Sequence, residues 1–397
     1  MGFKTGIVGL PNVGKSTLFN ALTRTSSAQT ANFPFCTIDP NVGEVPVPDQ
    51  RLQELSKIAF SKIIIPTKMT FVDIAGLVRG ASRGEGLGNK FLANIRECDA
   101  IIHVLRCFQS SEVTHVSGKV DPIADADIIE TELLLADLET VQKRITSVAK
   151  KANSGDKESK KALIVFEKIM KAISDGVPAR AIKYEEEDIH IVNSLQLLTA
   201  KPILYVCNVS ESAAAKGNKF SIEVEELVNS RKAKMVIISA VIEEEISKLE
   251  DPEDARLFLE DLGLEEPGLN RIISSGYNLL NLQTFFTVGP NETRAWTIPN
   301  GALAPQAAGK IHSDFEKGFI RAEIISYADY VKHDGEQGAK EAGKFRRVGN
   351  PEERTRSNCP EEGRNQQRCC TPAAPAADYR SDGGRAPARA APPRSRR

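Results

Sequence analysis

Short runs of apolar residues alternate with helical stretches through much of this chain. The clearest runs are Thr5–Val8, Met69–Val72, Ala100–Leu105, Ile203–Cys207 and Met235–Ile238. A continuous apolar run, without polar alternation, is typical of a strand that is buried on both faces in a parallel sheet covered by helices. The pattern therefore predicts an α/β domain, formed by residues 1–125 and 200–275, with a mostly parallel sheet and helices on both faces.

Between residues 126 and 199 the apolar residues follow a helical spacing instead. One series is Leu134, Leu138, Val141, Ile145 and Val148, and a second is Leu163, Phe166, Met170 and Ile173. Steps of three and four residues are those of a coiled-coil seam. Because the polar turn Asn153–Asp156 separates the two series, we expect an antiparallel helical hairpin, called the arm below, inserted into the α/β domain.

Residues 276–350 show a third pattern. Strand-like segments at 284–288 and 294–298 flank the turn residues Gly289–Glu292, which predicts a hairpin, and 319–325 is a further strand candidate. The last 47 residues, from Pro351 onward, contain no Val, Ile, Leu, Phe, Met, Trp or Lys but ten Arg. Such a segment buries too little apolar surface to offset chain entropy, so 351–397 is predicted to be disordered.

Composition narrows the class of protein further. A length of 397 residues suggests two or three domains, and no apolar run approaches the roughly 18 residues of a membrane helix. Seven cysteines without regular spacing give no disulfide framework and no zinc-site pattern, which favours a reduced, cytoplasmic protein without membrane contact. The net charge of −1 indicates no general affinity for nucleic acid.

Charge is nevertheless concentrated on the arm. The segment from Lys143 to Lys171 contains nine Lys and Arg residues but only three acidic residues, Asp156, Glu158 and Glu167. Two interpretations are open. The residues form an ordinary solvated helix surface, or they contact the phosphate backbone of RNA.

The segment Gly9–Thr17 fits the phosphate-binding pattern G-x-x-x-x-G-K-[ST], between a predicted strand and a predicted helix. Backbone N–H groups of such a loop surround a phosphate chain at the positive end of the helix. We expect Lys15 to reach the β- and γ-phosphates as a catalytic cation and the Ser16 hydroxyl to bind Mg²⁺. The predicted phosphate contacts are Asn12, Val13, Gly14, Lys15, Ser16 and Thr17.

A second motif, Asp73-Ile74-Ala75-Gly76, ends the next predicted strand and fits the D-x-x-G pattern of switch proteins. Asp73 is expected to hold Mg²⁺ through water, and the Gly76 N–H to contact the γ-phosphate. Upstream, Thr37 offers a second hydroxyl ligand for Mg²⁺ from a loop that closes around a γ-phosphate.

The residue after this motif is Leu77, where many GTPases have a glutamine that orients the attacking water. A leucine cannot bind water, so hydrolysis requires another group. His115, on a polar loop after the strand 100–105, is the candidate catalytic residue.

Base recognition also departs from the guanine-specific pattern N-K-x-D. After the strand 203–207 this chain has Asn208-Val209-Ser210-Glu211, without the lysine and with a longer acid. Because the acceptor geometry for guanine is displaced, we expect Asn208, Val209 and Glu211 to favour ATP over GTP. Ser239 and Ala240 match the S-A element that lies behind the base.

Together these motifs resemble the YchF/Obg-like ATPase family, from residue 1 to about 348. The segments that carry the resemblance are Gly9–Thr17, Asn32–Asn41, Asp73–Leu92, His115–Asp121, Asn208–Glu211, Trp296–Ile298 and Ala304–Glu316. The resemblance implies a GTPase-type P-loop fold that prefers ATP, a helical insertion and a C-terminal, β-grasp-like TGS domain. It further implies Mg²⁺, association with the ribosome, expected at the large subunit, and a role for the histidine at position 115. The closing strand of the family's TGS domain is absent here, so residues 276–350 are expected to form an incomplete one.

Two functions remain open. The chain is a hydrolytic ATPase that acts as a switch on the ribosome, in translation or stress regulation. Alternatively it is a GTPase, or a nucleotide-gated binding module whose slow hydrolysis is incidental. Leu77 favours slow intrinsic turnover in either case.

Overall fold

The computed structural model describes residues 3–30, 42–74, 87–110, 119–249, 251–349 and 368–371. A first sheet has the strand order β2 (Val42–Pro46), β4 (Lys68–Asp73), β1 (Lys4–Val8), β5 (Ala100–Arg106), β6 (Ile203–Asn208) and β7 (Lys234–Ile238). All neighbouring strands are parallel except β2, which is antiparallel to β4. The mostly parallel sheet is confirmed.

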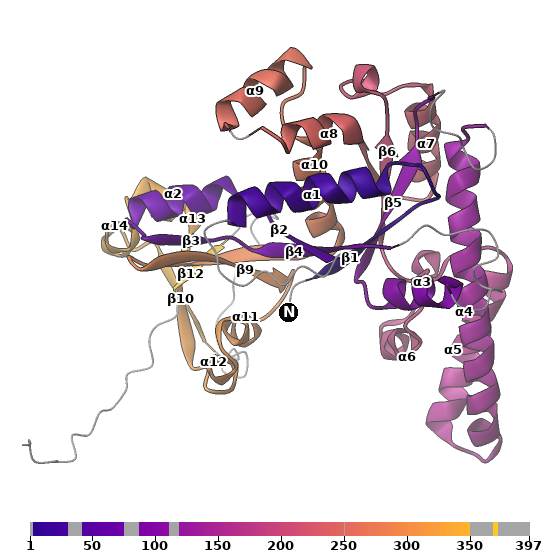
Figure 1. The fold of residues 1–397 in the computed structure, drawn as a ribbon. Helices are drawn as coiled ribbons and strands as arrows, with labels where there is room; N and C mark the ends of the chain where they lie inside the picture. Colours follow the sequence, from indigo (N-terminus) through magenta and orange to yellow (C-terminus); the bar gives the residue numbers. More distant parts are fainter. Residues whose placement is uncertain are drawn as a thin grey trace, which may run out of the picture.

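Helices cover this sheet (Figure 1). They are α1 (Lys15–Thr30), α3 (Leu87–Arg96), α7 (Lys219–Ser230), α8 (Ala240–Ile246) and α10 (Gly268–Leu279), whereas α9 (Pro252–Asp261) lies beyond α8, away from the sheet. In Figure 1, α1 and α10 lie above the sheet and α3 lies below it. Side chains such as Leu18 and Leu22 of α1 and Ile272 of α10 are fully buried against the strands.

The inserted arm is the antiparallel hairpin that the spacing predicts (Figure 1). Its helices are α4 (Pro122–Asn153) and α5 (Lys157–Ser174), followed by the short helices η1 (Ala179–Ala181), η2 (Glu186–Asp188) and α6 (Ile189–Ser194). Asp121 caps α4 through the Ala124 N–H at 3.0 Å. The start of α4 departs from the expected boundary at 126. Ile129 and Leu133 are buried in the core of the first sheet, so the first turns of α4 belong to the α/β domain.

A second sheet forms most of the C-terminal unit. Its order is β11 (Phe345–Gly349), β10 (Arg321–Ser326), β12 (Arg368–Thr371), β8 (Leu282–Val288), β9 (Glu292–Pro299) and β3 (Ile63–Ile65). The associated helices are α2 (Gln50–Ile58), α11 (Ala304–Ile311), α12 (Ser313–Lys317), α13 (Tyr327–Lys332) and α14 (Glu336–Glu341). The predicted hairpin is the antiparallel pair β8–β9.

This sheet corrects two expectations. The tail was predicted to be disordered, but it contains the strand β12. This strand pairs antiparallel with β10 and parallel with β8, so it fills a place in the sheet where the C-terminal unit was expected to lack a strand. In addition, β3 lies in the range assigned to the α/β domain but pairs with β9 of the C-terminal unit. A short apolar run such as Ile63–Ile65 fits an edge of either sheet, so its partner is decided by tertiary contacts.

In the part of the chain that the structure describes, we find no helix with the length and apolar character needed to span a bilayer.

Candidate nucleotide-binding site

The phosphate loop lies between β1 and α1 and is closely packed from behind. Gly14 has φ +96°, a conformation that favours glycine, and a Cβ at this position would lie 2.2 Å from Nδ2 of Asn208. A Cβ at Gly9 would lie 2.6 Å from the backbone oxygen of Val104. Any larger residue at either position would therefore clash with its neighbours. The loop leads directly into the N-terminus of α1, where phosphate binding is favoured.

Lys15 and Asp73 bring opposite charges into this partly buried site. The Lys15 ammonium donates a 3.0 Å hydrogen bond to the backbone oxygen of Leu10, and its side chain is buried. Burial lowers the pKa of Lys15, and the Asp73 carboxylate raises it in part. Burial likewise raises the pKa of Asp73, and Lys15 lowers it in part. Each charge thus offsets part of the other's desolvation.

Oxygen donors suited to Mg²⁺ lie at this end of the sheet. The Asp73 Oδ1 atom is buried and has no hydrogen-bond partner among the described residues, and Ser16 is exposed at the start of α1. A carboxylate and a hydroxyl fit this ion, which is normally bound by one or two protein groups together with substrate phosphates and water. Within the described ranges, no group of three or more His, Cys, Asp or Glu side chains could hold a metal alone.

Asn208, predicted to contact the base, ties two parts of the site together. Its Nδ2 donates to the backbone oxygen of Val13 at 2.9 Å, and its Oδ1 accepts from the Ala240 N–H at 2.9 Å. The side chain therefore joins the phosphate loop to the start of α8. Ser239, next to Ala240, is buried, and its hydroxyl has no hydrogen-bond partner in the described part of the chain.

The neighbouring base-site positions differ in exposure. Val209 is buried, and its N–H donates to the backbone oxygen of Ile238 at 2.8 Å. Glu211 is exposed at the start of η3 (Glu211–Ala213). The structure thus brings Asn208, Val209, Ser239 and Ala240 together beside the phosphate loop. Thr37, Gly76, Leu77 and His115 lie outside the described residues, so their roles stay predictions.

The basic residues of the arm fall into two groups. Lys161 is paired with Glu187 at 2.8 Å and Asp188 at 3.3 Å, and Lys143 is paired with Glu139 at 2.5 Å. Within the described ranges, the seven other exposed cations of this segment form no ion pair; they are Arg144, Lys150, Lys151, Lys157, Lys160, Lys168, which donates to the Lys183 backbone oxygen, and Lys171.

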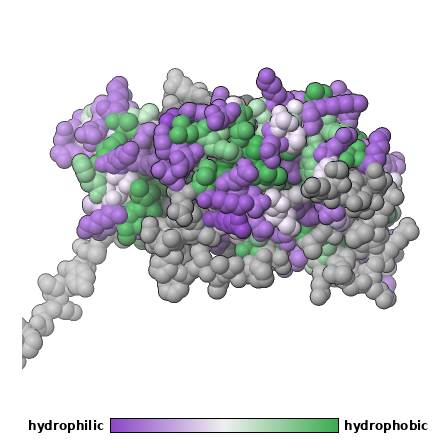
Figure 2. All heavy atoms as spheres, turned by 45° about the horizontal axis from the view of Figure 1, so that its top comes forward, coloured by the Kyte–Doolittle hydropathy of each residue, from purple (hydrophilic) through white to green (hydrophobic). Residues whose placement is uncertain are grey.

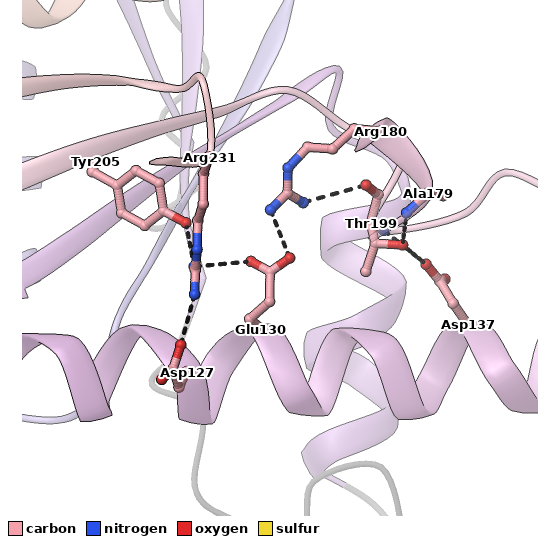
Figure 3. Close-up of polar contacts among 8 residues, drawn as sticks. All are labelled: Asp127, Glu130, Asp137, Ala179, Arg180, Thr199, Tyr205 and Arg231. Carbon is pink, nitrogen blue, oxygen red and sulfur yellow. Dashed lines mark hydrogen bonds and ion pairs between the residues drawn. The ribbon is translucent and has the colours of Figure 1, made fainter. Parts of the chain in front are cut away.

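A charged cluster at the base of the arm was missed from the sequence (Figure 3). Glu130 of α4 accepts from Arg180 at 2.6 Å and lies 3.9 Å from Arg231, which also contacts Asp127 at 2.7 Å and the Tyr205 hydroxyl at 3.0 Å. These contacts fix α4 to β6 and to the residue after α7. A signal was present in the sequence, because the first half of α4 is rich in acids and the second half in bases.

Farther along α4, Asp137 is fully buried and makes a second connection (Figure 3). It accepts hydrogen bonds from the Leu198 and Thr199 N–H groups, both at 2.8 Å, and from the Thr199 hydroxyl at 2.6 Å. The residues before β6 are thereby held against the arm. The arm is joined to the nucleotide domain by satisfied polar contacts as well as by apolar packing.

Comparison with known proteins agrees with this architecture. Residues 4–168 match a family model described as a 50S ribosome-binding GTPase, and residues 282–353 match the C-terminal model of YchF GTPases, described as a protein of unknown function. The chain is 55% identical over 349 residues to the ribosome-binding ATPase YchF of Haemophilus influenzae, covering 88% of this chain and 95% of that one. The chain belongs to the YchF family.

Further members of the YchF family support the assignment. The ribosome-binding ATPase YchF of Bacillus subtilis is 52% identical over 351 residues, with the same coverage of 88% and 95%. The solved structure of the Schizosaccharomyces pombe YchF GTPase has a TM-score of 0.82 and 38% identity, and the match covers 94% of this chain and 98% of that one. The family-level expectation from the sequence motifs is therefore confirmed.

Proposed function

We propose that this chain is a Mg²⁺-dependent ATPase that binds the ribosome and acts there as a nucleotide switch. The observation that carries the proposal is the closely packed phosphate loop, with a buried Lys15 and, at the same end of the sheet, an Asp73 carboxylate oxygen that has no partner among the described residues. The names of the bacterial relatives, ribosome-binding ATPase YchF, give the same activity and partner.

In this proposal each side chain has a defined task. Lys15 leaves the Leu10 carbonyl and places its ammonium beside the β- and γ-phosphates, where charge develops during transfer. Ser16 and Thr37 would hold Mg²⁺ directly and Asp73 would hold it through water, and the bound ion would neutralise charge on the phosphate oxygens. The N–H of Gly76 contacts the γ-phosphate.

ATP is the preferred nucleotide, and GTP binds more weakly. Val209 is too short and apolar to pack along a base as the lysine stem of guanine-specific proteins does. Glu211 places its carboxylate one methylene farther from the backbone than aspartate. The Asn208 side chain already forms hydrogen bonds with Val13 and Ala240, so neighbouring residues must recognise the edge of the base.

Hydrolysis requires a group that orients water, and Leu77 cannot supply it. We assign this task to His115, because an imidazole nitrogen can accept a hydrogen bond from water. The His115→Ala variant should lose about 10-fold or more in turnover while retaining ATP affinity. A parallel loss of affinity would make His115 a structural residue instead.

The exposed cations of the arm contact RNA of the large ribosomal subunit. Reversing Lys150, Lys151, Lys157 and Lys160 to Glu should weaken ribosome co-sedimentation and reduce its dependence on salt. A matched control reverses four exposed lysines of the nucleotide domain, Lys216, Lys219, Lys232 and Lys234. Equal ribosome binding by both variants would indicate that the arm lysines form an ordinary solvated surface.

A slow-turnover binding module is the second candidate, and Leu77 is the observation that favours it. Measuring ATP turnover with and without ribosomes separates the two. Acceleration by ribosomes indicates a hydrolytic switch, whereas slow turnover that ribosomes leave unchanged indicates a module gated by nucleotide binding alone.

A further inference from the structure

The segment between β2 and β4 belongs to two parts of the molecule at once. It starts and ends in the first sheet, but α2 and β3 between them join the C-terminal unit (Figure 1). Ile63–Ile65 of β3 pair in parallel with Glu292–Arg294 of β9. The two sheets are therefore linked by main-chain pairing as well as by side chains.

Side chains of α2 complete the core of the C-terminal unit. Leu52 and Leu55 are buried in one cluster with Phe286 of β8 and Ile325 of β10. The Arg51 guanidinium lies over the Phe286 ring at 4.9 Å from its centroid. A cluster that includes a fully buried Leu55 cannot be exposed without a large cost, so α2 and the C-terminal sheet are expected to move together.

Polar contacts close the junction at the turn between α2 and β3. The Ser61 hydroxyl donates to the Gly289 backbone oxygen at 2.7 Å and lies 2.7 Å from the Thr293 hydroxyl. The Lys62 N–H donates to the Pro290 backbone oxygen at 3.2 Å. These contacts join the end of α2 to the β8–β9 turn.

The same segment leads directly to the nucleotide site. β4 follows β3 after two residues and ends at Asp73. Its residues 68–72 pair with β2, and Asp73 pairs with Ile7 of β1. The Val47 N–H also donates to the Thr67 backbone oxygen at 2.8 Å. Because only two residues separate β3 from β4, a displacement of Asp73 along β4 is expected to reach β3 through a short stretch of chain.

We propose that α2 and β3 couple occupancy of the nucleotide site to the order of the C-terminal sheet. The proposal rests on the proposed function only in requiring Mg²⁺ and nucleotide to bind at Lys15 and Asp73. Binding that fixes Asp73 stabilises β4, and through it the β3–β9 pairing. Because such coupling is reciprocal, loosening the β3–β9 junction should weaken Mg²⁺-nucleotide binding by up to the same factor.

Hydrogen exchange tests this coupling. In the full chain, adding Mg²⁺ and a non-hydrolysable ATP analogue should slow amide exchange in residues 292–299. The Ser61→Ala variant should show less of this protection and bind the analogue about fivefold to tenfold more weakly, at the low end of typical coupling energies. The control is Ser194→Ala, which removes a hydroxyl that donates to the Ile191 backbone oxygen within α6 and should behave as the wild type.

Leu55→Ala extends the series as a stronger perturbation of the same junction, and Ser61→Ala keeps the test valid if that variant fails to fold. Binding of the analogue is followed separately by fluorescence titration. If the analogue binds but exchange at 292–299 does not change, the coupling is wrong while the nucleotide site stands. If the analogue does not bind at all, the proposed function and the coupling both fail.

Discussion

Asn208 occupies the space that any side chain at position 14 would need. A Cβ on Gly14 would lie 2.2 Å from the Asn208 amide nitrogen, which itself donates to Val13 in the same loop. Since Asn208 also holds Ala240, the phosphate loop and the base side of the site are shaped by one residue.

The Gly14→Ala substitution should therefore damage nucleotide binding far more than its backbone strain alone explains. Displacing Asn208 moves the loop, and a misplacement of about 1 Å can cost about 100-fold in function. Gly155→Ala is a matched control, because Gly155 has φ +99° with nothing within 4 Å of the added Cβ. That variant should lose only about 1–2 kcal/mol of stability and bind ATP normally. Equal ATP affinities for the two variants would refute the steric role of Asn208.

His103 predicts a dependence of stability on pH. Burial, with help from the positive charge of Arg231, lowers the pKa of His103 to about 3. The unfolded chain takes up a proton near pH 6.5 that the folded chain refuses, so stability falls as pH drops below that value. Between about pH 7.5 and about pH 5.5 this residue should remove about 1.4 kcal/mol of unfolding free energy.

The His103→Gln variant should lack this contribution. Urea unfolding of both proteins at the two pH values, followed by circular dichroism, isolates it as the difference between their pH slopes. Identical slopes would mean that His103 is accessible to protons in the folded state.

The cluster around Glu130 predicts a large effect from a small substitution. Glu130→Gln removes the negative charge that lies between Arg180 and Arg231 in a mostly buried setting, and breaking such a pair costs about 3 kcal/mol. Glu253→Gln breaks an exposed pair with Arg256 and should change stability very little, because solvent screens that pair. Thermal unfolding of the two variants compares them directly. A similar, small loss in both would show that the ion pairs of Glu130 contribute little to holding the arm.

Nucleotide preference should follow the residues after β6. Replacing Val209 with Lys and Glu211 with Asp in one variant restores the guanine-reading pattern, and should shift the ratio of ATP to GTP affinity toward GTP by about 10-fold, or about 1.4 kcal/mol. Calorimetric titration of both nucleotides measures the ratio. An unchanged ratio would place base selection elsewhere in the site.

Local motifs and periodicity were enough to predict the first sheet, the phosphate loop and the arm. Gly14 and Lys15 lie in one strand–loop–helix unit, and Asp73 lies at the end of a neighbouring strand. The spacing of these residues in the sequence is therefore enough to predict the phosphate-binding site. The apolar seam of the arm likewise depends on residues three and four positions apart. Such signals survive in a single sequence because the interacting residues are near neighbours along the chain.

The remaining features depend on partners far apart in sequence. Ser61 meets Gly289 and Thr293 across more than 200 residues. Nothing in the run Ile63–Ile65 specifies β9 as its partner. In the same way, Arg368–Thr371 was assigned to a disordered tail on composition, although a four-residue strand needs little apolar content when neighbouring strands supply its hydrogen bonds.

Steady-state ATP turnover with and without ribosomes, in the wild type and in Lys15→Ala, tests the central claim most directly. Our account predicts slow Mg²⁺-dependent turnover of the wild type, acceleration by ribosomes, and loss of both in Lys15→Ala, because the ammonium that stabilises the transferring phosphoryl group is gone. Turnover in Lys15→Ala equal to the wild type, or a wild-type rate that ribosomes leave unchanged, would contradict it.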